Sequence, residues 1–224
     1  MSNVEEHYAE VIDIINDLGP EAKELGIGVA WAYHDDPRHL LFTLSRYKFV
    51  SKMFDGMNKV LEIGCGDGFG SRLLLQNISS LVAIDIDQLF IDDAIRRQSK
   101  AWPIDFRIHD ILDDGPIDEG FDGVVSCDVM EHIPSEKHQL FLDNICSSLN
   151  DGGCALIGMP SIESQKYASP RSKIGHVSCL DQKTFKETLK KKFQKVFIFS
   201  MNDEVVHTGY SSMSHYNLAL CIKN

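Results

Sequence analysis

Three observations in the 224-residue sequence predict an α/β fold, a mostly parallel sheet with helices on both of its faces. Short apolar segments alternate with helix-length segments over most of the chain, which is typical of strand–helix–strand units. The first of these apolar segments runs directly into a glycine cluster at 64–70. Acidic residues follow several of the apolar segments where each one ends. We expect these ends to meet at one edge of the sheet, where such folds bind ligands.

The composition is that of a folded chain with a hydrophobic core, with 43% hydrophobic and 25% charged residues. No apolar run approaches the roughly 18–20 residues of a membrane span, and the polar N-terminus lacks the features of a secretory signal. The six cysteines form no C-x-x-C pair, so we expect reduced thiols and neither a zinc ribbon nor a disulfide framework. Together these features predict a cytoplasmic protein with no membrane contact.

The formal net charge of −11 bears on the class of partner. An acidic chain repels phosphate backbones, because non-specific nucleic-acid affinity comes from Lys and Arg side chains that neutralise phosphates. The one basic stretch, 183–195, is typical of a solvated helix face. We therefore expect a small-molecule substrate and no nucleic acid, and a positively charged ligand would suit the acidic chain. The sequence leaves the oligomeric state open.

The first part of the chain is predicted to be mainly helical. Apolar residues at a helical period predict a helix over 4–18, which Gly19-Pro20 ends. A second helix is predicted over 37–54, and the aromatic-rich stretch 26–36 between them is typical of a loop. Its aromatic side chains either cover a ligand or anchor the helices to the core. We interpret 1–57 as an N-terminal helical extension or lid.

The remaining residues, 58–224, are interpreted as one domain. The predicted strands are 59–63, 81–84, 105–109, 120–126, 154–159, 193–200 and 214–222. The predicted helices are 69–76, 87–99, 136–149 and 180–192. Asp87 is placed to cap the second of these helices. The last two strands have no helix between them, so one of them is expected to be antiparallel to the rest of the seven-stranded sheet.

The glycine cluster differs from the loop that binds dinucleotides. Its glycines allow a sharp turn and a close approach of a ligand to the main chain. In the dinucleotide fingerprint G-x-G-x-x-G the third glycine would fall on Phe69, or on Ser71 if the motif started two residues later. The carboxylates of Glu62 and Asp67 would also crowd a pyrophosphate. A ligand that carries an ammonium and a sulfonium group suits them better.

Acids at the following strand ends predict a nucleoside site. Asp85 ends the second strand, where a carboxylate commonly accepts hydrogen bonds from ribose hydroxyls, and a nicotinamide cofactor would use the same contact. Asp110 ends the third strand and could accept from an adenine amino group. Both could instead be ordinary cap or turn residues. Asp128 and Glu131 follow the fourth strand, so several acids are expected to surround one cleft.

With these motifs in order, the chain resembles class I (Rossmann-like) S-adenosylmethionine-dependent methyltransferases over roughly 58–160. The resembling segments are V-L-E-I-G-C-G-D-G at 60–68, V-A-I-D-I-D at 82–87, I-H-D-I-L at 108–112, F-D-G-V-V-S-C-D-V-M-E-H-I at 121–133 and L-N-D-G-G at 149–153. The fourth is similar to the branch that includes ubiquinone-biosynthesis O-methyltransferases. The resemblance implies a seven-stranded sheet with an antiparallel last strand and S-adenosyl-L-methionine as the cofactor.

The resemblance also implies roles for particular residues, carried over by position. The methionine side would be lined by Glu62, Gly64, Cys65 and Gly66. Asp85 and Ile86 would hold the ribose, Asp110 and Ile111 would flank the adenine, and Cys127 would sit beside the cofactor. No metal is predicted, because the spacing of Asp203, His207 and His215 matches no ligand pattern.

Methyl transfer from a sulfonium is an in-line displacement, so alignment and exclusion of water do most of the catalysis. A hydroxyl acceptor benefits from a general base, for which His is the usual choice. His132 is the first catalytic candidate, because it follows the fourth strand near the expected methyl group. His176, in the loop after the fifth strand, is the second. Either could instead be an ordinary structural histidine.

The function expected from the sequence is methyl transfer to a small molecule, to the oxygen of a sugar- or nucleotide-linked metabolite. The segments 175–180 and 201–210 resemble uncharacterised methyltransferases found near cell-surface sugar pathways, which favours a glycan-related acceptor. Two alternatives stay open at this point. One is a nicotinamide-dependent oxidoreductase, and the other is a non-catalytic domain that binds the cofactor and regulates a partner.

Overall fold

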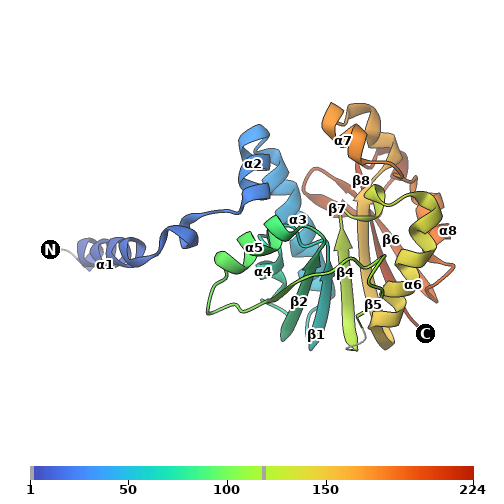
Figure 1. The fold of residues 1–224 in the computed structure, drawn as a ribbon. Coiled ribbons are helices and arrows are strands. Elements are labelled where there is room, and N and C mark those ends of the chain that lie inside the picture. The colour runs from blue at the N-terminus through green and yellow to red at the C-terminus, as the bar shows by residue number, and fades with distance from the viewer. Residues whose placement is uncertain (1–2, 118–119) are drawn as a thin grey trace.

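The computed structural model of the protein describes residues 3–117 and 120–224. Its centre is one twisted sheet with helices on both faces (Figure 1). The strands are β1 (Lys59–Ile63), β2 (Ser80–Asp85), β3 (Asp105–Ile108), β4 (Phe121–Cys127), β5 (Leu149–Pro160), β6 (Lys195–Asn202), β7 (Val205–His207) and β8 (Tyr216–Ile222). Their order across the sheet is β3-β2-β1-β4-β5-β8-β6-β7.

The strand directions confirm the predicted fold class. Strands β1 to β5 pair in parallel, whereas β8 runs antiparallel to both of its neighbours, β5 and β6. The sheet has eight strands where the sequence predicts seven. The additional strand is β7, which forms a hairpin with β6. Its three residues are too few to show an alternating pattern, so sequence periodicity could not reveal it.

The helices follow the predicted order with two differences. They are α1 (Asn3–Asp17), α2 (Ile27–Asp35), α3 (Arg38–Met53), α4 (Ser71–Leu74), α5 (Gln88–Arg96), α6 (His138–Ser148), α7 (Pro170–Gly175) and α8 (Gln182–Leu189). Asp87 caps α5 as predicted, accepting the Leu89 N–H at 2.9 Å. The stretch 26–36 is not a loop, because most of it forms α2. The short helix α7 was not predicted.

Helix α2 forms because carboxylates from the domain satisfy its first N–H groups. Asp93 accepts the Ile27 N–H at 3.1 Å, and Asp67 accepts those of Gly28 and Val29 at 2.9 and 2.8 Å. These three N–H groups have no partner inside the helix. The stabilising groups come from far along the chain, so the local sequence did not reveal the helix.

The core consists of two apolar layers, one on each face of the sheet. Adjacent strand residues alternate between them, so that Leu61 and Val124 belong to one layer and Val60 and Val125 to the other. The first layer includes side chains of α6 and α8, and the second includes side chains of α3, α4 and α5. Helix α1 projects away from this body (Figure 1). No helix within the described residues has the length and apolar character needed to cross a bilayer.

Candidate active site

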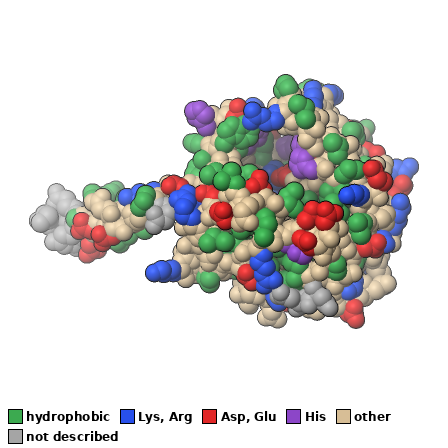
Figure 2. All heavy atoms as spheres, viewed as in Figure 1, with side chains coloured by type: hydrophobic (Ala, Val, Ile, Leu, Met, Phe, Trp, Pro, Cys, Tyr) green, Lys and Arg blue, Asp and Glu red, His purple; other side chains and the backbone are tan. Residues whose placement is uncertain are grey.

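A cavity of about 460 Å³ opens at the carboxyl ends of the first four strands. The order β2-β1-β4 reverses the direction of winding at β1, and such a switch point is where open α/β sheets bind ligands. Figure 2 shows the hollow on this face of the molecule, with histidine side chains nearby. The lining residues are Ile63, Gly64, Gly66, Ile84, Asp85, Ile86, Phe90, His109, Asp110, Ile111, Leu112, Asp128, Val129, His132, Ile133, Pro134 and Lys137.

The glycine loop is held against the end of β2 and leaves one face open to the cavity. The N–H groups of Gly64 and Cys65 both donate to the Ile84 carbonyl, at 2.8 and 3.0 Å. A β-carbon at Gly64, where φ is +78°, would lie 2.2 Å from the Val129 side chain. At Gly66, by contrast, a β-carbon would meet nothing within 4 Å. A ligand can therefore approach the main chain closely at this point.

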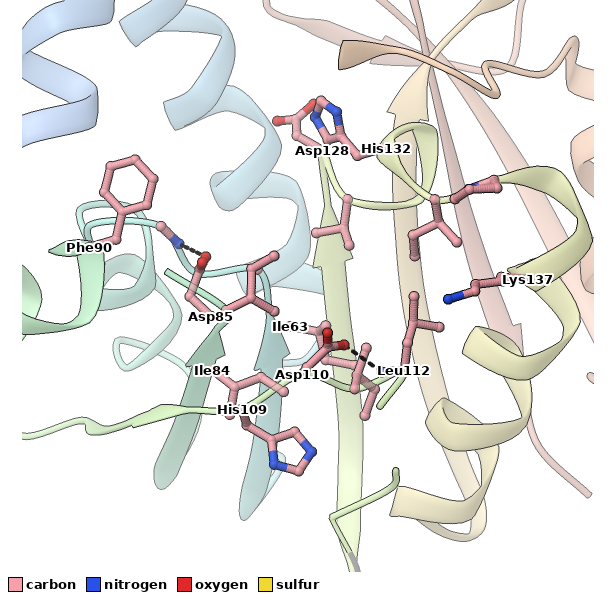
Figure 3. A pocket seen from close by; sticks show the side chains of 17 residues that line it. Ile63, Ile84, Asp85, Phe90, His109, Asp110, Leu112, Asp128, His132 and Lys137 are labelled. Atoms are coloured by element: carbon pink, nitrogen blue, oxygen red, sulfur yellow. Dashed lines mark hydrogen bonds between the residues drawn. The ribbon is translucent and has the colours of Figure 1, made fainter. Parts of the chain in front are cut away.

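The two strand-end acids predicted to hold a nucleoside lie in the cavity wall, oriented by backbone N–H groups. Asp85 accepts from Gly66 N–H at 2.8 Å and from Asp87 N–H at 3.0 Å. Asp110 accepts from Leu112 N–H at 2.8 Å. Figure 3 shows both carboxylates at the cavity. A carboxylate has about four lone-pair sites, so each can accept further hydrogen bonds from a ligand.

The rest of the wall suits a nucleoside with a positively charged chain better than a dinucleotide. The walls around the acids are largely aliphatic, with one phenyl ring from Phe90. Charged lining groups are three carboxylates, Asp85, Asp110 and Asp128, and one ammonium, Lys137. A pyrophosphate would meet a surplus of negative charge. The residues present therefore fit S-adenosylmethionine, which carries an adenosine, a sulfonium and an ammonium.

Some predicted ligand residues lie behind the cavity wall. Glu62, Cys65 and Cys127 do not line the cavity, and neither do the acids Asp67 and Glu131. The six acids expected to surround one cleft are thus divided, three in the wall and three beneath it. Two of the buried acids bind other parts of the protein: Asp67 caps α2, and Glu62 accepts from Tyr47.

Glu62 bonds the N-terminal helices to the first strand. The Tyr47 hydroxyl of α3 donates to Glu62 Oε1 at 2.5 Å, and the Glu62 side chain is 2% exposed. Burial raises the pKa of Glu62 to about 7, although the Tyr47 hydrogen bond acts in the opposite direction. Cys65, within the glycine loop, is also buried, and burial raises its thiol pKa above the ordinary value.

Asp128 joins α3 to the other end of the cavity. Its backbone is in the left-handed region, with φ of +59°, which a non-glycine residue adopts at a cost. Its carboxylate pairs with the largely buried Arg46 of α3 at 2.7 Å. Its N–H points to the Gly158 carbonyl at 3.1 Å. These contacts hold the strained turn that leads from β4 to His132.

The two predicted catalytic histidines lie side by side, with ring centroids 5.3 Å apart. His132 lines the cavity, and its Nδ1 contacts the Gly175 carbonyl at 2.8 Å. His176 does not line the cavity, and its Nδ1 contacts Gln165 Oε1 at 2.9 Å. Burial, together with the neighbouring His132, lowers the pKa of His176. The loop is held here because the Val177 N–H donates to the Glu131 carbonyl at 2.8 Å.

Glu131 lies beside these two histidines, and sequence reasoning missed that the three residues come together. Its side chain is 1% exposed, and its Oε1 lies 3.9 Å from His132 Nε2. Burial and the charge of Asp128 raise the pKa of Glu131 well above its usual range. The sequence indicated an acid beside a histidine, but not that the loop at 175–177 returns to them. Phe90, His109 and Lys137 were also missed, since no motif marks them as cavity residues.

Comparison with known proteins agrees with this geometry. Residues 60–153 match a protein family described as a methyltransferase domain. Rat glycine N-methyltransferase is 31% identical over 117 residues, which are 46% of this chain and 40% of that protein. The mitochondrial ubiquinone biosynthesis O-methyltransferase of Schizosaccharomyces pombe is 28% identical over 120 residues, 50% of this chain and 44% of that protein. The matches thus span less than half the length of these curated relatives.

The fold is shared with solved methyltransferase structures. The N-methyltransferase NodS from Bradyrhizobium japonicum WM9, in complex with S-adenosyl-L-homocysteine, superposes with a TM-score of 0.64 at 23% identity. The superposition covers 91% of this chain and 96% of NodS. Residues 60–153 thus match a methyltransferase domain, and the chain shares the fold of a methyltransferase that was solved with S-adenosyl-L-homocysteine.

Proposed function

We propose that this protein transfers the methyl group of S-adenosylmethionine to an oxygen of a small molecule, a sugar- or nucleotide-linked metabolite. One observation carries the proposal. One cavity has Asp85 and Asp110 on one side, in a wall that suits a nucleoside, and the His132 imidazole on the other side. A cofactor bound along the first side would direct its methyl group toward the second.

The cofactor side rests on the strand ends. Asp85 is proposed to accept from the ribose hydroxyls, and Asp110 from the adenine amino group, with Ile86 and Ile111 against the rings. The open main chain at Gly66 would receive the methionine part. When bound, the cofactor supplies an electrophilic methyl group on a sulfonium.

The acceptor side supports a proton-accepting role for His132. Its Nδ1 contacts a carbonyl oxygen, which can only accept, so Nδ1 carries the proton and Nε2 has a free lone pair. A hydroxyl aligned with the methyl group could pass its proton to Nε2. The cavity volume of about 460 Å³ and the net charge of −11 both favour a small acceptor over nucleic acid. Solved neighbours include N- and carbon methyltransferases, so the acceptor atom needs a direct test.

Calorimetric titration tests the cofactor first. The purified chain is expected to bind S-adenosylhomocysteine at micromolar concentration and to give no heat with NAD or NADP. Binding of a nicotinamide cofactor alone would contradict the proposal. Transfer of a labelled methyl group to a panel of sugars, nucleotide sugars, phenols and amines then identifies the acceptor, and labelling of amines alone would contradict the assignment to oxygen.

Replacement of His132 tests the acceptor side. His132→Ala is expected to lower turnover by roughly 100-fold or more while leaving affinity for S-adenosylhomocysteine within about twofold, because a base acts only in the transfer step. His207→Ala is the matched control, since this imidazole bonds to Asn202 on the β6–β7 hairpin. Near-normal turnover of His132→Ala would move the role to His176 or leave it to alignment alone.

A further inference from the structure

Glu131, His132 and His176 form a cluster that the proposed transfer uses only in part. One carboxylate oxygen and one nitrogen of each imidazole lie within 4.8 Å of one another. Among the side chains that the structure describes, no other group of three or more His, Cys, Asp or Glu is arranged in this way. Ligands around one ion, at bonds of about 2.1 Å, lie roughly 3–4 Å apart, so small side-chain rotations suffice to bring these atoms into range.

Both imidazoles are already oriented as metal-binding histidines are. The Nδ1 atoms of His132 and His176 contact the Gly175 carbonyl and Gln165 Oε1, at 2.8 and 2.9 Å. These oxygens only accept, so each ring keeps its proton on Nδ1 and offers the lone pair of Nε2. An outer acceptor of this kind fixes the tautomer and the angle of a ligating ring. His132 Nε2 faces Glu131 Oε1 at 3.9 Å.

The Glu131 carboxylate is buried without the partners that a buried acid requires. Its side chain is 1% exposed, and neither oxygen has a hydrogen-bond partner among the described residues. The neighbouring cation, Arg46, pairs with Asp128. Buried charges are normally paired or bound to a metal, so this carboxylate points to a missing cation.

We infer that Glu131, His132 and His176 bind one divalent transition-metal ion at the acceptor side of the cavity. Two imidazoles and one carboxylate suit ions such as Mn²⁺, Fe²⁺, Co²⁺ and Zn²⁺, whereas Mg²⁺ and Ca²⁺ prefer oxygen ligands. The sequence predicts no metal, from the spacing of Asp203, His207 and His215. The three residues inferred here match no short motif, because two of them are adjacent and the third lies far along the chain. Three protein ligands leave coordination positions of the ion open to other ligands. These open positions would face the cavity, because His132 lines it.

The catalytic part of this inference rests on the proposed function. An acceptor hydroxyl held by the ion would lose its proton to water, because a bound cation lowers the pKa of the hydroxyl. Its oxygen would then form a bond to the methyl carbon as the C–S bond breaks, with the electron pair of that bond going to sulfur. With the ion bound, the lone pair of His132 Nε2 holds the ion in place of accepting the proton, and the proton goes to water.

Titration of the full chain with Mn²⁺, followed by electron paramagnetic resonance of the free ion, tests the site without any turnover. After treatment with a chelator, the wild type is expected to bind one Mn²⁺ per chain. Glu131→Gln, which keeps the shape of the side chain, and His176→Ala are each expected to weaken binding at least tenfold. Co²⁺ absorption in the visible range gives a second readout of coordination by nitrogen and oxygen.

A variant outside the ligand set keeps the test decisive if those chains fold poorly. Gln165→Leu removes the acceptor of His176 Nδ1 and is expected to weaken Mn²⁺ binding about tenfold, while Gln165→Glu restores it. His207→Ala is the imidazole control and is expected to bind Mn²⁺ as the wild type does. Circular dichroism checks the fold of each variant.

The outcomes separate this inference from the proposed function. The metal site is overturned if the wild type binds neither Mn²⁺ nor Co²⁺. It is also overturned if Glu131→Gln, His176→Ala and Gln165→Leu all bind Mn²⁺ as the wild type does. If S-adenosylhomocysteine binds and methyl transfer proceeds equally well with a chelator present, the proposed function stands and the catalytic role of the ion fails. If one ion binds as expected but S-adenosylhomocysteine does not, the site stands and the proposed function fails.

Discussion

Asp85 has two sets of partners in its proposed role, the glycine loop and the ribose. The carboxylate accepts from Gly66 N–H at 2.8 Å, so it shapes the loop before any ligand arrives. The same group stands in the cavity wall, where its remaining lone pairs are available. A neutral amide at this position could keep the loop contact but would lose the charge that strengthens hydrogen bonds from hydroxyls.

Replacement of Asp85 tests this double role. Asp85→Ala is expected to weaken S-adenosylhomocysteine binding by about 1–3 kcal/mol, the usual range for charge-assisted hydrogen bonds. Asp85→Asn should fall between this variant and the wild type, because its amide oxygen can still accept from Gly66. Asp87→Ala, at the α5 cap and outside the lining, is the control. Calorimetry measures all three, and unchanged affinity in Asp85→Ala would remove the ribose assignment.

Glu62 makes stability depend on pH. Its pKa rises from 4.5 to about 7 on burial, so between these values the folded chain holds a proton that the unfolded chain has lost. Stability therefore falls as pH rises through this window, by at most about 3 kcal/mol from this residue. Urea unfolding from pH 5 to 8 is expected to show this fall relative to Glu62→Gln, which has no proton to lose. Parallel curves for the two proteins would contradict the assignment.

At the scale of elements, α2 depends on groups outside its own sequence. Gly26 precedes it with φ of +116°, and a β-carbon there would lie 2.5 Å from the Asp67 carboxylate. Substitution at this position therefore adds a steric conflict to the strain of a left-handed backbone. The conflict falls on the group that caps α2.

Gly26→Ala is expected to detach the start of α2 from the glycine loop. Hydrogen exchange should become faster at residues 27–35, since the N–H groups lose their acceptor. Gly56→Ala is the matched control, because its φ is +83° but a β-carbon there would meet nothing within 4 Å. That variant should cost only the backbone strain, about 1–2 kcal/mol, with α2 exchange unchanged. Equal exchange in both variants would show that Asp67 does not hold the helix.

The same elements show what sequence could and could not predict. The parallel strands follow from the alternation of strand-length and helix-length segments, and the Asp87 cap follows from the residue type at a helix start. The structure confirms both. Helix α2 and the burial of Glu131 depend on residues from other elements, and a local sequence pattern carries no information about those contacts. His132 and His176 were each predicted from position, but their contact depends on a loop path that no spacing rule encodes.

For the whole molecule, ligand binding and stability are linked. A ligand that binds only the folded chain stabilises it by about 2.7 kcal/mol at 100 times its Kd. For a chain of this length that corresponds to a rise in Tm of about 5–10 °C. S-adenosylhomocysteine is expected to give this rise in a thermal scan and NAD at the same concentration to give none. A flat response to both would place the cavity's ligand outside adenosine chemistry.

The Asp67 carboxylate has a further consequence. It accepts from Phe69 in the glycine loop at 3.1 Å and from the first turn of α2, so one side chain is shared by the loop and by a helix outside it. A ligand that orders the glycine loop should therefore also order the start of α2. An acceptor that contacts α2 could in this way raise the affinity for the cofactor. Because binding free energies are reciprocal, the bound cofactor would then raise the affinity for that acceptor by the same factor. The two substrates would then bind more tightly together than either does alone, whichever binds first, through a single shared carboxylate.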